Sequence, residues 1–95
     1  MPEMRFVIRW PDGAEEACYS PSLVVQEHMT PGESYPVVDF VERSRVALSI
    51  ASERVREKYG FACSSALDQL ARIEAQAERF SDATEARVAV LSFHP

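Results

Sequence analysis

Residues 58–65 read Lys58-Tyr59-Gly60-Phe61-Ala62-Cys63-Ser64-Ser65, and amphipathic sequence lies on both sides of them. Gly60 can take the left-handed conformation that ends many helices. Ser65, with Asp68 three residues later, is a helix-start signal. Side chains with helical spacing precede and follow the glycine: Val41, Ser44, Leu48, Ala51, Val55 and Tyr59, then Ala66, Leu67, Leu70, Ile73, Ala77 and Phe80. The sequence therefore predicts a helical hairpin.

Two strand-like runs flank this hairpin, at residues 4–10 and 86–93. Apolar and other side chains alternate in the first run, and valines are frequent in the second, as expected of strands. Pro11-Asp12-Gly13 has the composition of a tight turn, which makes residues 15–19 a return strand. We expect one α+β domain over residues 1–95. It contains a small antiparallel or mixed three-stranded sheet with the helical hairpin packed on one face, in the order β-β-(short α)-α-α-β.

The short helix is expected over residues 23–28, with Ser20 as its cap and Pro21 at its first position. Tyr35-Pro36 keeps the chain extended before the next element. Asp39 and Glu42 then form a candidate capping box, which starts the first long helix.

The composition is that of an average soluble domain, with 95 residues, 46% hydrophobic and 26% charged. The net charge of −5, without a basic run, argues against nucleic-acid binding. No signal sequence or membrane-length apolar run is present, so we expect a cytoplasmic protein without membrane contact. A chain this short has a thin core, which makes a homodimer the expected assembly.

The cysteines Cys18 and Cys63 are interpreted as free thiols, because two cysteines so far apart do not form a disulfide framework. Each precedes a predicted helix start, where the helix dipole lowers a thiol pKa, but burial as a small apolar residue is the favoured interpretation. His28 and His94 lack the paired spacing of metal ligands. We expect no metal and no cofactor.

A candidate thiol or ligand site can still be formulated from four residues. Cys18 would be its nucleophile or adduct site, Tyr19 and Ser20 its hydrogen-bond donors, and Arg43 its anion partner, all near the short helix. No run of residues is a catalytic signature, so we assign no catalytic residue and favour a protein that is not an enzyme.

Val46 and Ile50 form a second apolar strip on the first long helix, roughly opposite Leu48 and Val55. Charged residues flank the strip, which is the arrangement of a contact surface with an apolar centre. Either this strip is a protein interface, or the loop before Tyr35 folds over it.

Several blocks in order along the chain resemble a known family. They are residues 1–4, 9–13, 18–22, 39–43, 51–55 and 60–64. Together they are similar to a small bacterial nitrogen starvation response family. Its genes lie in clusters with a nitrilase, a radical-SAM protein, an acetyltransferase, a flavoprotein and a relative of a purine-biosynthesis synthetase. The resemblance implies a role in scavenging nitrogen from nitriles or cyanide, and it carries over no catalytic residue.

Two hypotheses follow. The first is a non-enzymatic accessory protein, expected to be a homodimer, that binds or stabilises an enzyme of the same cluster. The second is a small-molecule-binding or thiol-dependent protein that uses Cys18. We favour the first, because an active thiol needs a neighbouring base and neither histidine can be placed near Cys18.

Overall fold

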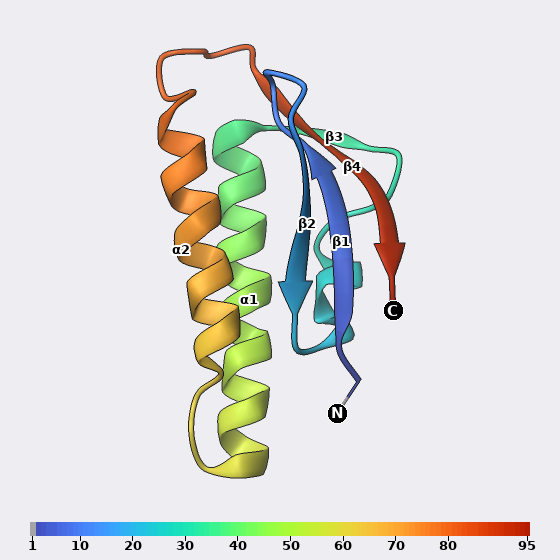
Figure 1. Cartoon of the computed structure of the whole chain (residues 1–95), viewed down its shortest axis with the longest axis vertical. Helices are drawn as coiled ribbons and strands as arrows, with labels where there is room; N and C mark the ends of the chain where they lie inside the picture. Colours follow the sequence, from blue (N-terminus) through green and yellow to red (C-terminus); the bar gives the residue numbers. More distant parts are fainter. Residues whose placement is uncertain (1) are drawn as a thin grey trace.

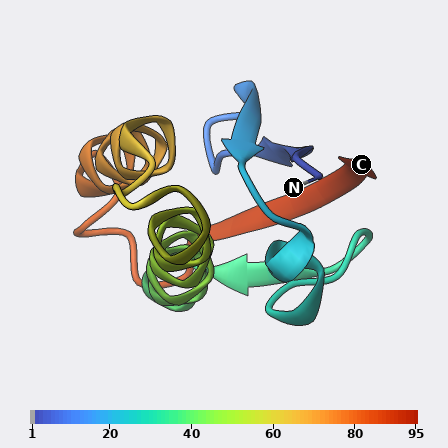
Figure 2. The same ribbon diagram turned by 90° about the horizontal axis from the view of Figure 1, so that it is seen from below.

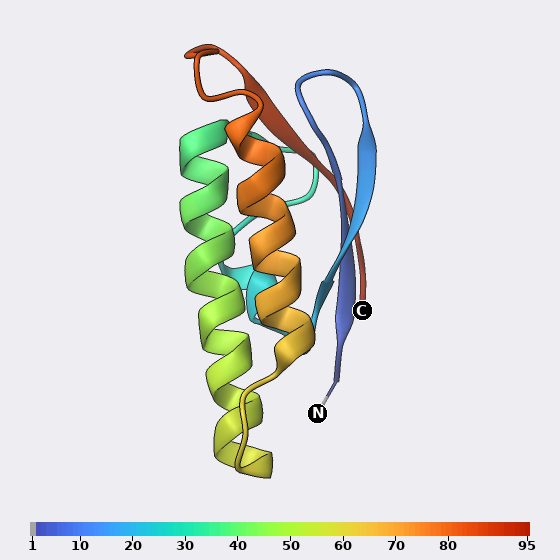
Figure 3. The same cartoon turned by 60° about the vertical axis from the view of Figure 1, so that its left-hand side comes forward.

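The computed structural model describes residues 2–95, which form a sheet and two long helices (Figure 1). In chain order the elements are β1 (Met4–Arg9), β2 (Glu15–Ser20), the 3₁₀ helix η1 (Leu23–Glu27), β3 (Ser34–Pro36), α1 (Val37–Tyr59), α2 (Ser64–Glu78) and β4 (Arg87–His94). Both long helices lie side by side on one side of the sheet (Figure 3). The predicted α+β class and helical hairpin are confirmed. Within the described residues, no helix is both long and apolar enough to cross a membrane.

The sheet has four strands in the order β2-β1-β4-β3, and every neighbouring pair is antiparallel. The prediction of three strands was therefore wrong, and so was the predicted element order, which lacked β3. The extra strand is the Tyr35-Pro36 segment, which is extended as predicted but also pairs with β4. Three residues are too short to show an alternating pattern, and only pairing with β4 defines them as a strand. In Figure 2 the four strands form one curved layer beside the helices.

The core lies between the inner face of the sheet and the helical hairpin. Trp10, directly after β1, is its largest buried side chain. Its ring meets Phe40 of α1 edge-on at 5.8 Å between centroids and stacks on Phe80 at 6.1 Å. The other fully buried large side chains come from the sheet, the two long helices and η1: Phe6, Phe40, Met4, Ile8, Leu48, Ile73, Val25, Val88 and Val90.

The helix ends differ in part from the predicted signals. Gly60 ends α1 as expected, with φ of 86° and its N–H donating to the Arg56 carbonyl at 2.8 Å. The start was predicted two residues late, because α1 begins at Val37 and Asp39 lies inside its first turn. The Asp39 carboxylate accepts from Arg43 at 2.9 Å instead of capping the helix.

The other two starts also shift. Cys63 rather than Ser65 is the N-cap of α2, and it makes no side-chain capping hydrogen bond. Ser22 rather than Ser20 caps η1, because the Ser22 hydroxyl accepts from the Val24 N–H at 3.3 Å. The preceding Ser20 belongs to β2.

Two residues of the predicted apolar stripes are exposed. Tyr59 is 52% exposed and Leu67 is 46% exposed, whereas Ser44, Leu48, Ala51, Ala66, Ile73 and Ala77 are buried as expected. For Tyr59 the reason is length, since α1 has 23 residues and extends past the end of the sheet (Figure 1). The end of α1 therefore has no sheet beneath it.

A buried amide joins α2 to the free edge of β2. The Gln69 side chain is only 3% exposed, and its Oε1 accepts from the Tyr19 N–H at 3.0 Å. Its Nε2 donates to Glu16 at 3.3 Å, and Glu16 also accepts from the Trp10 Nε1–H at 3.0 Å. This network satisfies a backbone donor of an edge strand and fixes the distance between helix and sheet.

We expect Gln69→Ala to lower the free energy of unfolding by about 2 kcal/mol, because it leaves the Tyr19 N–H without its acceptor and removes one of the two donors to the Glu16 carboxylate. The control is Gln76→Ala, which changes the other glutamine of α2, a half-buried residue outside this network. It should change the free energy of unfolding by less than about 0.5 kcal/mol. Urea denaturation measures both. Equal effects of the two substitutions would contradict the assigned role.

Ser44 provides a test of opposite sign. Its hydroxyl is buried in the core without a hydrogen-bond partner among residues 2–95. Ser44→Ala removes that unsatisfied group and should raise the free energy of unfolding by about 1 kcal/mol, measured by the same denaturation. Destabilisation would mean that the hydroxyl has a partner in solution.

Candidate functional site

The structure places Cys18 in the core rather than at a surface. Its side chain is completely buried on the inner face of β2, next to Glu16. Burial raises the pKa of the Cys18 thiol far above its ordinary value, and the neighbouring Glu16 carboxylate raises it further. The thiol is therefore protonated at neutral pH, and a protonated thiol is a poor nucleophile.

Strand geometry separates Tyr19 from its two neighbours. Successive side chains of a strand point to opposite faces, so Cys18 and Ser20 point into the core while Tyr19 points outward. The Arg5 guanidinium lies over the Tyr19 ring, 5.1 Å from its centroid. Partial burial, with Glu3 next to it, raises the pKa of Tyr19 to about 12. The Ser20 hydroxyl donates to the Ser22 carbonyl at 2.7 Å and faces no cavity.

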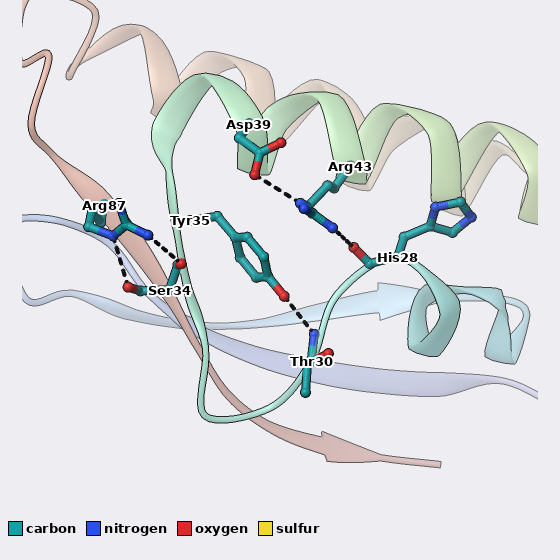
Figure 4. A network of polar contacts seen from close by, with 7 residues as sticks. All are labelled: His28, Thr30, Ser34, Tyr35, Asp39, Arg43 and Arg87. Carbon is teal, nitrogen blue, oxygen red and sulfur yellow. Dashed lines mark hydrogen bonds and ion pairs between the residues drawn. The ribbon is translucent and has the colours of Figure 1, made fainter.

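Arg43 holds the loop after η1 against α1 (Figure 4). Its Nη1 donates to the His28 carbonyl at 2.7 Å, and its guanidinium lies 4.3 Å from the centroid of the Tyr35 ring. The Tyr35 hydroxyl in turn accepts from the Thr30 N–H at 2.9 Å. The Asp39 hydrogen bond raises the pKa of Arg43. The structure therefore does not bring Cys18, Tyr19, Ser20 and Arg43 around one pocket.

The Val46–Ile50 strip is only partly open. Val46 is 38% exposed and Ile50 is half-buried. The arginines beside it contact the chain before Tyr35, since Arg54 donates to the Ser22 hydroxyl at 3.0 Å. The loop thus lies alongside the strip, while Val46 stays at the surface. The strip remains a candidate interface of small area.

A larger apolar surface lies elsewhere on the helical hairpin. A groove of about 570 Å³ opens between the first turns of α1 and the end of α2, and we call it the hairpin groove. Val38, whose side chain is 82% exposed, forms one wall of it. Its lining includes the apolar Val38, Val41, Ala77 and Phe80 and the charged Glu42, Arg45, Glu74 and Glu78. Because the lining is mostly apolar, the groove suits an apolar side chain better than a polar ligand.

The charges at the rim of the hairpin groove are mostly paired with one another. Arg45 bridges the two helices, with Nη1 2.6 Å from Glu42 and Nη2 3.0 Å from Glu74. These carboxylates raise the pKa of Arg45. Glu78 has no cation within ion-pair distance in the part of the chain that the structure describes. Three carboxylates and one guanidinium make the rim negative.

A second, polar pocket of about 400 Å³ lies beside the start of α2. Its lining residues are Glu3, Arg5, Tyr19, Ser65, Asp68 and Arg72. Its two cationic and two anionic side chains balance, so the pocket favours neither an anionic nor a cationic ligand. The half-buried Cys63 is the N-cap of the same helix. Residues 2–95 contain no cluster of potential metal ligands.

Sequence reasoning missed the hairpin groove because its lining comes from three separate segments, around residues 36–45, 74–78 and 80–84. One signal was available. Val38 precedes Val41 by three residues but lies outside the predicted apolar stripe. Its aliphatic side chain therefore had no place in the predicted core, which indicated an apolar surface at the start of the first long helix.

These features define the class: a two-layer α+β protein with a buried thiol and an apolar groove on its helical hairpin. The family follows from comparison, since the chain matches the family model of nitrogen starvation-induced protein NitG over residues 5–93. The chain belongs to this family, so the predicted relation to nitrogen starvation is confirmed. Searches among curated proteins and among solved structures found no match.

The buried thiol predicts a pH dependence of stability. Above about pH 8.5 the unfolded chain loses the Cys18 proton, while the folded protein retains it. The folded state then binds more protons, so the free energy of unfolding falls as pH rises, by up to about 1.4 kcal/mol per pH unit. Below that pH both states are protonated and the thiol contributes nothing.

The measurement uses a Cys63→Ser background, with and without Cys18→Ala, and denaturation between about pH 7 and pH 10. We expect a steeper loss of stability when Cys18 is present. Parallel curves for the two proteins would show that the thiol ionises in the folded state.

Proposed function

We propose that this protein is a cytoplasmic, non-enzymatic accessory protein of a nitrilase-type gene cluster for nitrile or cyanide assimilation. It is produced under nitrogen starvation and acts by binding an enzyme of the same cluster. Membership of the nitrogen starvation-induced family supports the setting. The observation that carries the mode of action is the hairpin groove, an apolar surface with a charged rim.

The groove favours protein contact over chemistry for two reasons. Its best-exposed member, Val38, is an aliphatic side chain that gains free energy when a partner covers it. The Arg45 guanidinium at its rim pairs with Glu42 and Glu74. These ion pairs fix the orientation of the three side chains, and they leave no acid and base free to act together in a reaction. An apolar centre with oriented charges around it is typical of protein interfaces.

The alternative, a small-molecule or thiol-dependent protein that uses Cys18, has less support. The sulfur is buried, its pKa is raised, and the nearest ionisable group is a carboxylate rather than a cation that would stabilise a thiolate. Tyr19 and Arg43, its proposed companions, face other parts of the molecule.

The two functions can be separated in a strain whose own gene is deleted, grown with a nitrile or cyanide as nitrogen source. We expect the wild-type gene and Cys18→Ala to restore growth and Val38→Asp to fail. Val38→Asp should fold, because the side chain is exposed and a negative charge is favourable in the first turn of a helix. Gln26→Asp, at an exposed position of η1, is the matched control and should restore growth.

Co-purification tests the contact itself. The tagged protein is co-expressed with each enzyme of the cluster in turn, and we expect one enzyme to be retained stoichiometrically. The accessory function would be refuted if no enzyme is retained in any pairing. Growth with Val38→Asp but not with folded Cys18→Ala would instead favour the thiol-dependent function.

A further inference from the structure

We propose that the hairpin groove receives the hairpin tip of a second copy of this chain, so that two copies pack antiparallel through the same side of their helical hairpins. The hairpin tip is the segment of residues 58–67, from the end of α1 to the first turn of α2. The inference rests on the proposed function only in taking the groove as a protein-contact surface. It assigns the groove of the free protein to a second copy, which a cluster enzyme has to displace in order to bind there.

The exposed apolar residues are concentrated at these two places. Among residues 2–95, the exposed large apolar side chains are Val38, Val46, Tyr59, Phe61 and Leu67. Three belong to the hairpin tip, where Phe61 is 69% exposed, and Val38 belongs to the groove. Only Val46 lies outside both. Exposed aromatic side chains at the end of a projecting hairpin are of the type that anchors protein interfaces.

Groove and tip lie on the same side of the helical hairpin. Val41 and Tyr59 are 18 residues apart, which is about five turns, so they project from the same face of α1. On α2, Leu67 precedes Glu74 and Glu78 by 7 and 11 residues, about two and three turns. One side of the hairpin thus carries the groove at one end and Tyr59 and Leu67 of the tip at the other.

This arrangement fits a two-fold axis. In a symmetric dimer, if the tip of one copy enters the groove of its partner, the reverse contact forms as well. The two contacts would lie about 27 Å apart, from 18 residues at about 1.5 Å rise each. Between them the surface carries the small, exposed Ser49 and Ala71 and the paired, exposed Glu53 and Arg56.

Charge complementarity between the tip and the groove supports a second copy as the occupant. Lys58 lies beside the Tyr59 ring, 5.6 Å from its centroid, and has no carboxylate within ion-pair distance in the described part of the chain. The groove presents Glu78, which likewise has no cation near it among residues 2–95. Docking a tip into a groove brings an apolar anchor to an apolar lining and this cation to these carboxylates.

Lys58 is also the only lysine of the chain, which makes the test sharp. A carbodiimide joins an amine to a carboxylate that touches it. Isotope-labelled and unlabelled chains are mixed and cross-linked, and peptides are identified by mass spectrometry. We expect mixed-isotope peptides that join Lys58 to Glu78, Glu74 or Glu42. Mixed-isotope peptides that join Lys58 only to other carboxylates would overturn the proposed geometry.

Light scattering of the purified protein at tens to hundreds of micromolar tests the assembly. We expect a dimer, and an increase of its dissociation constant by about tenfold or more with Phe61→Asp. Lys58→Glu should weaken the dimer, and Glu78→Lys in the same chain should restore it. Val46→Asp is the matched control and should leave the dimer intact. A monomeric wild-type protein, or a dimer lost with Val46→Asp but not with Phe61→Asp, would refute the inference.

This outcome is separable from that of the proposed function. A monomer that still retains a cluster enzyme would refute the dimer alone. A tip-in-groove dimer that retains no enzyme would refute the accessory function alone.

Discussion

The packing of Trp10 between Phe40 and Phe80 is the contact on which the arrangement of the molecule depends. It holds the start of α1 and the segment after α2 against the same end of β1. The indole N–H is satisfied by Glu16, whose carboxylate also receives the Gln69 amide, so the aromatic cluster and the polar network share one residue. Because Phe80 lines the hairpin groove as well, the core contact that fixes the helices also shapes the surface between them.

Much of the fold could be predicted from local sequence. The alternation from Met4 to Trp10, the turn at Gly13 and the helix end at Gly60 each depend on a few neighbouring residues, and each is found in the structure. The strand β3 could not be predicted, because its three residues are a strand only through β4, which lies far along the chain. The start of α1 was misplaced because Asp39 resembles a cap, whereas the extended Pro36 marks the boundary.

The candidate site was harder to predict because it depends on tertiary contacts. The four residues of the predicted ligand or thiol site do not meet in the structure. Cys18 and Ser20 are buried, and Tyr19 points to the other face of the same strand. Arg43 instead binds the loop after η1. The hairpin groove forms only where the start of α1 meets the end of α2 and the segment that follows it. Exposure of Tyr59 likewise depends on how far α1 extends past the sheet, a length that the periodicity of the sequence does not give.

The two edge strands of the sheet, β2 and β3, have a consequence for the solubility of the protein. One border is the three-residue β3, which ends in a proline that has no N–H to offer. At the other, the Gln69 amide occupies a backbone donor of β2 that an incoming strand would need. These two positions are poor templates for adding a strand from another molecule, whereas residues 92–94 of β4 pair with β1 alone and leave a short open edge. Aggregation of this protein through its sheet is therefore confined to the short end of β4 that β3 does not cover.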